Sequence, residues 1–71
     1  MKKYELLKED TIEVYGKTLY RIRALRDVTD TILEGMFGGY IEHEDNLSHE
    51  GESWVGLHAE VYGNARVSGN A

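Results

Sequence analysis

The stretch that decides the fold is Val61-Tyr62-Gly63-Asn64-Ala65-Arg66, followed by Val67-Ser68-Gly69-Asn70-Ala71. An aliphatic residue opens each block, Gly-Asn fills its third and fourth places, and Ala fills the fifth. The block before them, residues 55–60, keeps Val55 and Ala59 but carries Leu57-His58 in place of Gly-Asn. A short, fixed period indicates one small structural unit stacked on itself.

The alternation within each block predicts short strands. In an extended chain, Val61, Gly63 and Ala65 point to one side, and the polar residues between them face water. Gly and Asn tolerate positive φ, so each Gly-Asn pair can turn a corner between strands. The pattern therefore predicts a coil with Val and Ala inside. A flexible low-complexity tail is the alternative; a helix fits poorly, because Val, Gly and Asn are weak helix formers.

This run resembles the hexapeptide-repeat, left-handed parallel β-helix family, whose motif is an aliphatic residue followed four places later by a small one. The match covers residues 55–71 well and residues 49–54 in part. With the lead-in of residues 38–49, it is similar to the N-terminal cap and first coil of bacterial and phage-borne V-x-G-N-A-x repeat proteins labelled as transferases. The resemblance implies an all-β chain that is a truncated piece of a longer protein. It places an N-terminal β cap in residues 1–46 and the hexapeptide-repeat coil in residues 47–71.

The N-terminal half predicts a β-hairpin. Residues 11–15 alternate apolar and polar side chains, residues 19–25 are rich in strand formers, and Gly16-Lys17 lies between them as a turn signal. A two-residue turn sets Val14 opposite Leu19, and a three-residue turn sets Ile12 opposite Tyr20. Both registers stay open. Residues 4–7 form either a third strand or a short turn.

The segment before the repeat predicts a short helical turn. Thr31 and Glu34 have the spacing of a capping box, which favours such a turn near residues 30–37 over a plain loop. Gly38-Gly39 then marks either a tight backbone approach or a bend, and a strand follows at residues 40–42.

Composition limits the classes of protein that fit. The 71 residues include no Cys, and 13 acidic against 8 basic residues give a net charge of −5. Disulfides are excluded, so a partner chain is the expected support for so small a core. The negative charge argues against nonspecific nucleic-acid binding. The start of the chain lacks the apolar run of a signal peptide and no stretch reaches membrane-spanning length, so a cytoplasmic protein without membrane contact is expected.

The densest polar cluster is a candidate metal site. Two His and five acidic residues fall within residues 42–52, and His43, Glu44 and His49 are the candidate ligands. Their spacing matches no dedicated metal motif, so solvated charge around a turn is the alternative.

His58 is the candidate catalytic residue. In hexapeptide-repeat acyltransferases a His acts as general base, and coenzyme A lies between neighbouring coils of a trimer. The resemblance therefore implies a coenzyme A thioester only if this chain belongs to a transferase. The alternative is that His58 merely replaces a corner Asn, because one coil offers no deep site. Three arginines, Arg21, Arg23 and Arg26, either hold a phosphate or pair with acids across a strand.

The functional expectation is a structural one. The sequence favours a capping or assembly module of a β-solenoid that forms homo-oligomers through its open solenoid end and holds no cofactor of its own. The alternative is the N-terminal part of an acyltransferase, which rests on resemblance alone.

Overall fold

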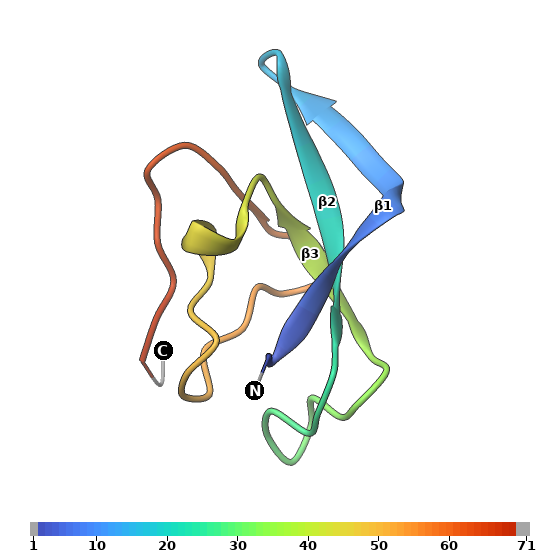
Figure 1. Cartoon of the computed structure of the whole chain (residues 1–71), viewed down its shortest axis with the longest axis vertical. Coiled ribbons are helices and arrows are strands. Elements are labelled where there is room, and N and C mark those ends of the chain that lie inside the picture. Colours follow the sequence, from blue (N-terminus) through green and yellow to red (C-terminus); the bar gives the residue numbers. More distant parts are fainter. Residues whose placement is uncertain (1, 70–71) are drawn as a thin grey trace.

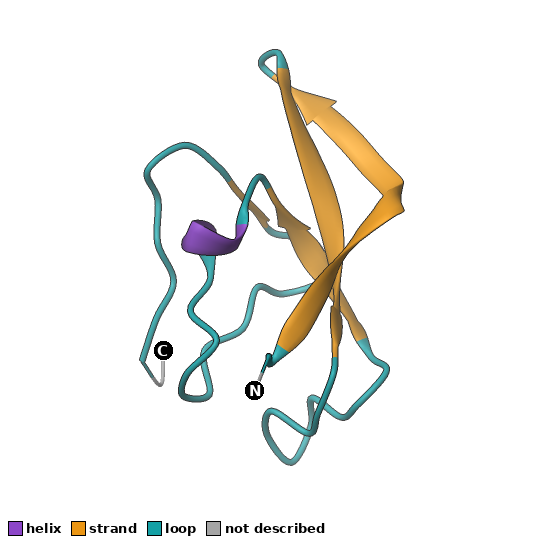
Figure 2. Ribbon diagram, viewed as in Figure 1, coloured by secondary structure: helices purple, strands orange, loops and turns teal. Residues whose placement is uncertain are grey.

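The structure, a computed structural model, describes residues 2–69. Its elements in chain order are β1 (Tyr4–Val14), β2 (Lys17–Ala24), β3 (Phe37–Ile41), the short 3₁₀ helix η1 (Glu44–Asn46) and β4 (Glu60–Val61). The four strands form one sheet in the order β1-β2-β3-β4 (Figure 2). The predicted all-β class is confirmed, and the described residues include no α-helix.

The hairpin of β1 and β2 turns at Tyr15-Gly16. Val14 pairs with Lys17 and Ile12 pairs with Leu19, so both registers expected from the sequence are wrong. The two turn residues have φ of 51° and 77°, as the two-residue turns favoured between twisted strands require. Gly16 supplies the second of these positive φ values at no steric cost, which moves the turn one residue earlier than Gly16-Lys17.

A bulge bends β1 in its middle. Leu7 pairs with Arg21 and Thr11 pairs with Tyr20, so three residues, 8–10, are left over on β1. The bend is visible in Figure 1. Residues 4–7 are therefore the first half of β1 rather than a third strand.

The connection from β2 to β3 is irregular, and the helical turn expected near residues 30–37 is wrong. The Thr29 hydroxyl accepts hydrogen bonds from the N–H groups of Thr31 and Ile32 at 3.2 and 3.1 Å. Ala24 donates to the Met36 carbonyl at 2.8 Å and accepts from Gly35 at 2.8 Å. Asp27 Oδ1 accepts the Glu34 N–H at 2.9 Å, so both N–H groups that a Thr31–Glu34 capping box would pair are bonded elsewhere.

After β3 the chain returns alongside itself in the same direction. Tyr40 pairs with Glu60, Ile41 with Val61, and Leu47 with Val67, all parallel. Each pair is separated by the same 20 positions. We call residues 40–48 the first pass and residues 60–68 the second pass; Figure 1 shows the second pass on the side of the molecule away from β1.

Corners follow the six-residue period. Ala59 donates its N–H to the Gly56 carbonyl at 2.9 Å, and six residues later Ala65 donates to the Tyr62 carbonyl at 3.3 Å. Gly63 and Gly69 have φ of 66° and 74°. The predicted corner at Gly63-Asn64 is confirmed, whereas Asn70 of the second predicted corner lies outside the described residues.

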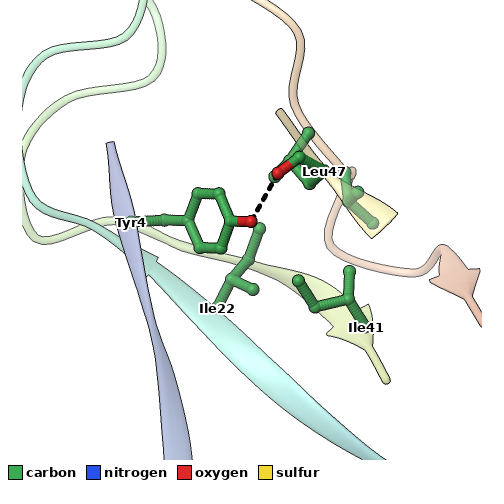
Figure 3. Close-up of a cluster of buried hydrophobic side chains, with 5 residues drawn as sticks. Tyr4, Ile22, Ile41 and Leu47 are labelled. Atoms are coloured by element: carbon green, nitrogen blue, oxygen red, sulfur yellow. Dashed lines mark hydrogen bonds between the residues drawn. The ribbon is translucent and has the colours of Figure 1, made fainter. Parts of the chain in front are cut away.

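The core confirms the predicted inward direction of the valines but not that of the described alanines. Tyr4, Ile22, Ile41, Leu47 and Val55 are its buried members, and Figure 3 shows the first four converging from separate strands and passes. Val61 and Val67 are half-buried against it. Ala59 and Ala65 are exposed, so the prediction that the alanines are interior is wrong for them; Ala71 lies outside the described residues. The second pass pairs with the first pass along one side, and its Tyr62 ring lies 6.3 Å from the Tyr15 ring of the hairpin tip.

The glycine pair of β3 lies under the chain that returns from the first pass. Gly38 and Gly39 are buried, and Gly39 donates its N–H to the Val55 carbonyl at 3.0 Å. A Cβ on Gly39 would lie 2.3 Å from the carbonyl oxygens of Gly56 and Ala59. The predicted tight approach is confirmed. The parallel pairing begins at Tyr40, and the boundary between residues 1–46 and 47–71 stays a prediction.

No helix within residues 2–69 combines the length and the apolar character needed to cross a bilayer.

Candidate functional site

Two of the three candidate metal ligands, Glu44 and His49, belong to a structural cluster around the His49 ring. The His49 ring stacks on Tyr4 with centroids 4.1 Å apart and planes 9° from parallel. The Lys3 backbone N–H donates to His49 Nδ1 at 3.1 Å, so this nitrogen is an acceptor. In neutral imidazole the other nitrogen, Nε2, then carries the proton, and it lies 2.7 Å from Glu44 Oε1. Both ring nitrogens are therefore occupied.

Glu44 is held in its charged form by this contact. The hydrogen bond from His49 holds the pKa of Glu44 below its ordinary value, against the opposing effect of partial burial. Lys2 Nζ lies 3.4 Å from the other carboxylate oxygen and lowers the pKa of Glu44 further.

His43 does not join the cluster. Its Nε2 lies 3.8 Å from Glu42 Oε1, on the other side of η1 in the sequence. Within residues 2–69 no three His, Cys, Asp or Glu side chains lie close enough together to hold a metal ion. Of the three candidate ligands, the structure brings Glu44 and His49 together. Both side chains also contact residues at the start of β1: Glu44 contacts Lys2, and His49 contacts Lys3 and Tyr4.

Three consecutive residues, Lys2, Lys3 and Tyr4, fasten this start of β1 to the loop after η1; we call them the N-terminal clamp. Lys3 is fully buried, and its Nζ donates to the Ser53 carbonyl at 2.7 Å, to Ser53 Oγ at 3.3 Å and to the Glu50 carbonyl at 3.5 Å. Burial, and then the charge of Arg26, lower the pKa of Lys3.

Tyr4 supplies the third part of the clamp. Its hydroxyl donates to the carbonyls of Leu47 and Glu44 (the Leu47 contact is dashed in Figure 3). Burial, followed by the charges of Glu44 and Asp45, raises the pKa of Tyr4. The clamp could not be predicted from the sequence, because a Lys is almost never fully buried.

Asn46 connects the two passes. It is fully buried, and its Oδ1 accepts the N–H groups of Glu42 and His43 at 3.1 and 3.0 Å. Its Nδ2 donates to the carbonyls of Gly63 and Ala65 at 3.2 and 2.8 Å. All four hydrogen-bonding positions of the side-chain amide are used.

Arg21 and Arg23 pair with acids rather than forming an anion site. Arg21 Nε donates to Asp10 at 2.8 Å, and its terminal nitrogens donate to the Gly38 carbonyl and to Tyr40 Oη at 2.8 and 2.9 Å. Tyr40 Oη in turn donates to Asp10 at 2.8 Å, which ties the β1 bulge to β3. Arg23 pairs with Glu5 across the hairpin.

His58 lies exposed in the corner formed by residues 56–59. Its side chain forms no hydrogen bond or ion pair with any residue between 2 and 69. A general base needs an orienting partner, so the structure supplies no support for a catalytic role of His58.

Two hollows flank Arg66 on the surface shared by the two passes. One, of about 270 Å³, is lined by His43, Asp45, Arg66 and the 63–65 corner. The other, of about 360 Å³, lies between Glu44, Ser48 and His49 on one side and Arg66 and Ser68 on the other. Their linings mix both signs of charge, and neither holds a nucleophile beside a free base.

The N-terminal clamp and the Asn46 amide both hold backbone segments together, and neither forms a recognisable catalytic or metal site. No known protein family, curated protein or solved structure matches this chain.

Proposed function

We propose that this protein is a structural capping and assembly module of a hexapeptide-repeat β-solenoid. The hairpin of β1 and β2 closes one end of the coil, and the second pass offers the other end for stacking. The observation that carries the proposal is the position of β3, which pairs antiparallel with β2 on one edge and parallel with β4 on the other.

A coil of parallel passes needs a cap at its first strand. The first strand of any stack of parallel passes has a free edge, whose unpaired backbone groups invite pairing with other chains. Here β2 occupies that edge of β3, and Tyr4 and Ile22 fill the core beside Ile41. The hairpin therefore covers both the backbone edge and the apolar interior of the first pass.

The solenoid part of the proposal is supported by the repeat geometry. Corners lie six residues apart, Gly63 and Gly69 have left-handed φ, and the three valines that open the blocks all contact the core. The parallel pairs keep one offset of 20 positions over both ends of the pass. A left-handed coil, formation of homo-oligomers through the open end, and a cytoplasmic location are part of the proposal.

Hydrogen–deuterium exchange tests the proposal. The N–H groups of Glu42, Ser48 and Val67 bond between the passes at 3.1, 2.9 and 2.9 Å, so we expect all three to exchange slowly. Weakening the cap with Tyr4→Ala should speed the exchange of all three. The control is Leu33→Ala on the exposed β2–β3 connection, which should leave them unchanged. Exchange of the Val67 amide at the rate of an unstructured peptide in the unmodified protein would rule out the coil.

The alternative, an N-terminal part of an acyltransferase with coenzyme A as co-substrate, stays a prediction. No contact of His58 within residues 2–69 favours it.

A further inference from the structure

The open side of the second pass carries unpaired backbone groups. Val61 O accepts from Glu42, and Val67 bonds through both its N–H and its C=O to the first pass. Consecutive residues of a strand direct these groups to opposite sides, so those of Glu60, Arg66 and Ser68 face away from the first pass. Within residues 2–69 no strand lies on that side, because β4 is the last strand of the sheet.

The apolar core continues onto the same side. Ile41 and Leu47 are fully buried, whereas Val61 and Val67, which lie beside them on the second pass, are only half-buried. Ala59 and Ala65 are exposed next to the valines. A patch of small apolar residues next to a free strand edge is suited to covering by another backbone.

Two opposite charges lie beside this patch. Glu60 precedes Val61 and Arg66 precedes Val67, and both side chains are exposed. Neither forms an ion pair with any other residue of the described chain. The open end therefore has an apolar centre and a rim with one negative and one positive charge, which is the usual anatomy of a protein interface.

We propose that a second copy of this chain covers the open end, related to the first by a two-fold axis. This deepens the proposed assembly function and rests on it. In a two-fold interface, if Glu60 of one copy contacts Arg66 of the other, then the reverse contact forms as well. One acid and one base on the same rim satisfy this condition, so the surface is complementary to itself. The edges of the two second passes pair, and the valines and alanines of both copies are buried between them.

Sedimentation velocity over a wide concentration series tests the proposal. We expect a monomer–dimer equilibrium that weakens with added salt, because the rim pairs are exposed. Glu60→Arg and Arg66→Glu should each weaken dimerisation by roughly tenfold, since each change replaces two attractions by two repulsions. The double variant Glu60→Arg/Arg66→Glu restores opposite charges across the axis and should recover most of the affinity.

Two further variants control for charge and for fold. Glu34→Arg makes the same charge change on the exposed β2–β3 connection and should leave dimerisation unchanged. Ala65→Lys places a charge on the patch at an already exposed position and should abolish the dimer without lowering the melting temperature. A monomer at every concentration would overturn the proposal, as would a dimer indifferent to Glu60→Arg, which would point to another surface or partner. The capping function survives either result if the Glu42, Ser48 and Val67 amides stay protected.

Discussion

At Gly39 the backbone leaves no room for a side chain. The limit is steric: an added Cβ would lie 2.3 Å from two carbonyl oxygens, both on backbone that is itself fixed by hydrogen bonds. The requirement comes from the crossing of residues 55–59 over β3, and not from an unusual φ, because Gly39 does not have a positive one.

Gly39→Ala should therefore destabilise the protein strongly. Overpacking of this kind costs about 1–3 kcal/mol, and rigid backbone neighbours place this site at the upper end. Gly56→Ala is the matched control, because a Cβ there meets nothing within 4 Å and its φ is ordinary. Urea unfolding of both variants measures the difference. Equal midpoints for the two would contradict the close approach.

At the residue scale, some conformations could be predicted from residue type and others could not. The positive φ values of Gly63 and Gly69 were predictable because Gly-Asn recurs at a fixed spacing. The hairpin turn was missed because its first residue is Tyr15, which rarely adopts the positive φ that this turn demands. The burial of Lys3 was missed because it depends on oxygens at residues 50 and 53, which no local pattern connects to it.

At the scale of elements, the start of β1 is held by groups that respond to pH. The raised pKa of Tyr4 means that the folded state keeps the phenol proton above about pH 10, where the unfolded chain releases it. The contribution of Tyr4 to stability is therefore complete below that pH and is lost as the pH rises further. Lys3 acts in the opposite direction, because its lowered pKa means that the folded protein releases this proton more readily than the unfolded chain, so stability rises with pH.

Tyr4→Phe should remove this alkaline sensitivity. At neutral pH we expect it to cost about 1–2 kcal/mol, because the Leu47 and Glu44 carbonyls each lose a donor. Above pH 10 the gap between the two proteins should narrow, since only the unmodified one then loses stability with rising pH. Lys3 is present in both, so its effect cancels. Urea unfolding as a function of pH measures the gap, and a constant gap up to pH 11 (about one unit above a free tyrosine) would contradict the assignment.

The sequence predicted the strands better than the segments between them. Residues 11–15 alternate apolar and polar side chains and residues 19–25 are rich in strand formers, so both could be predicted as strands, but the pattern did not determine how they pair. The β2–β3 connection was misassigned because the Thr29 hydroxyl and Asp27 Oδ1 accept the N–H groups of Thr31 and Glu34, which the capping box would have paired. Of the candidate site, Glu44 and His49 were predicted as neighbours, but their partners on β1 were not.

At the scale of the whole molecule, Asn46 connects the passes through four hydrogen bonds in a buried position. Asn46→Asp keeps the acceptor but replaces the donor with an oxygen facing the Gly63 and Ala65 carbonyls. We expect a loss of about 2–4 kcal/mol, the cost of a buried and unpaired charge.

Asn64→Asp is the control, because Asn64 is exposed and its substitution should change stability by less than about 0.5 kcal/mol. Thermal unfolding followed by circular dichroism and by Trp54 fluorescence measures both variants. Coincident transitions would indicate that cap and passes unfold as one unit. If Asn46→Asp melted at the same temperature as the control, the amide would not be joining the passes.

The dual pairing of β3 has one more consequence. Within the described residues the hairpin pairs with β3 through β2, and the clamp at its start is fastened to the loop after η1, so this cap does not require any fixed number of later passes. The same N-terminal segment, fused ahead of an unrelated hexapeptide-repeat array, should therefore cap that array as well. The fusion would need only the two adjacent glycines of β3 and a parallel strand beside them.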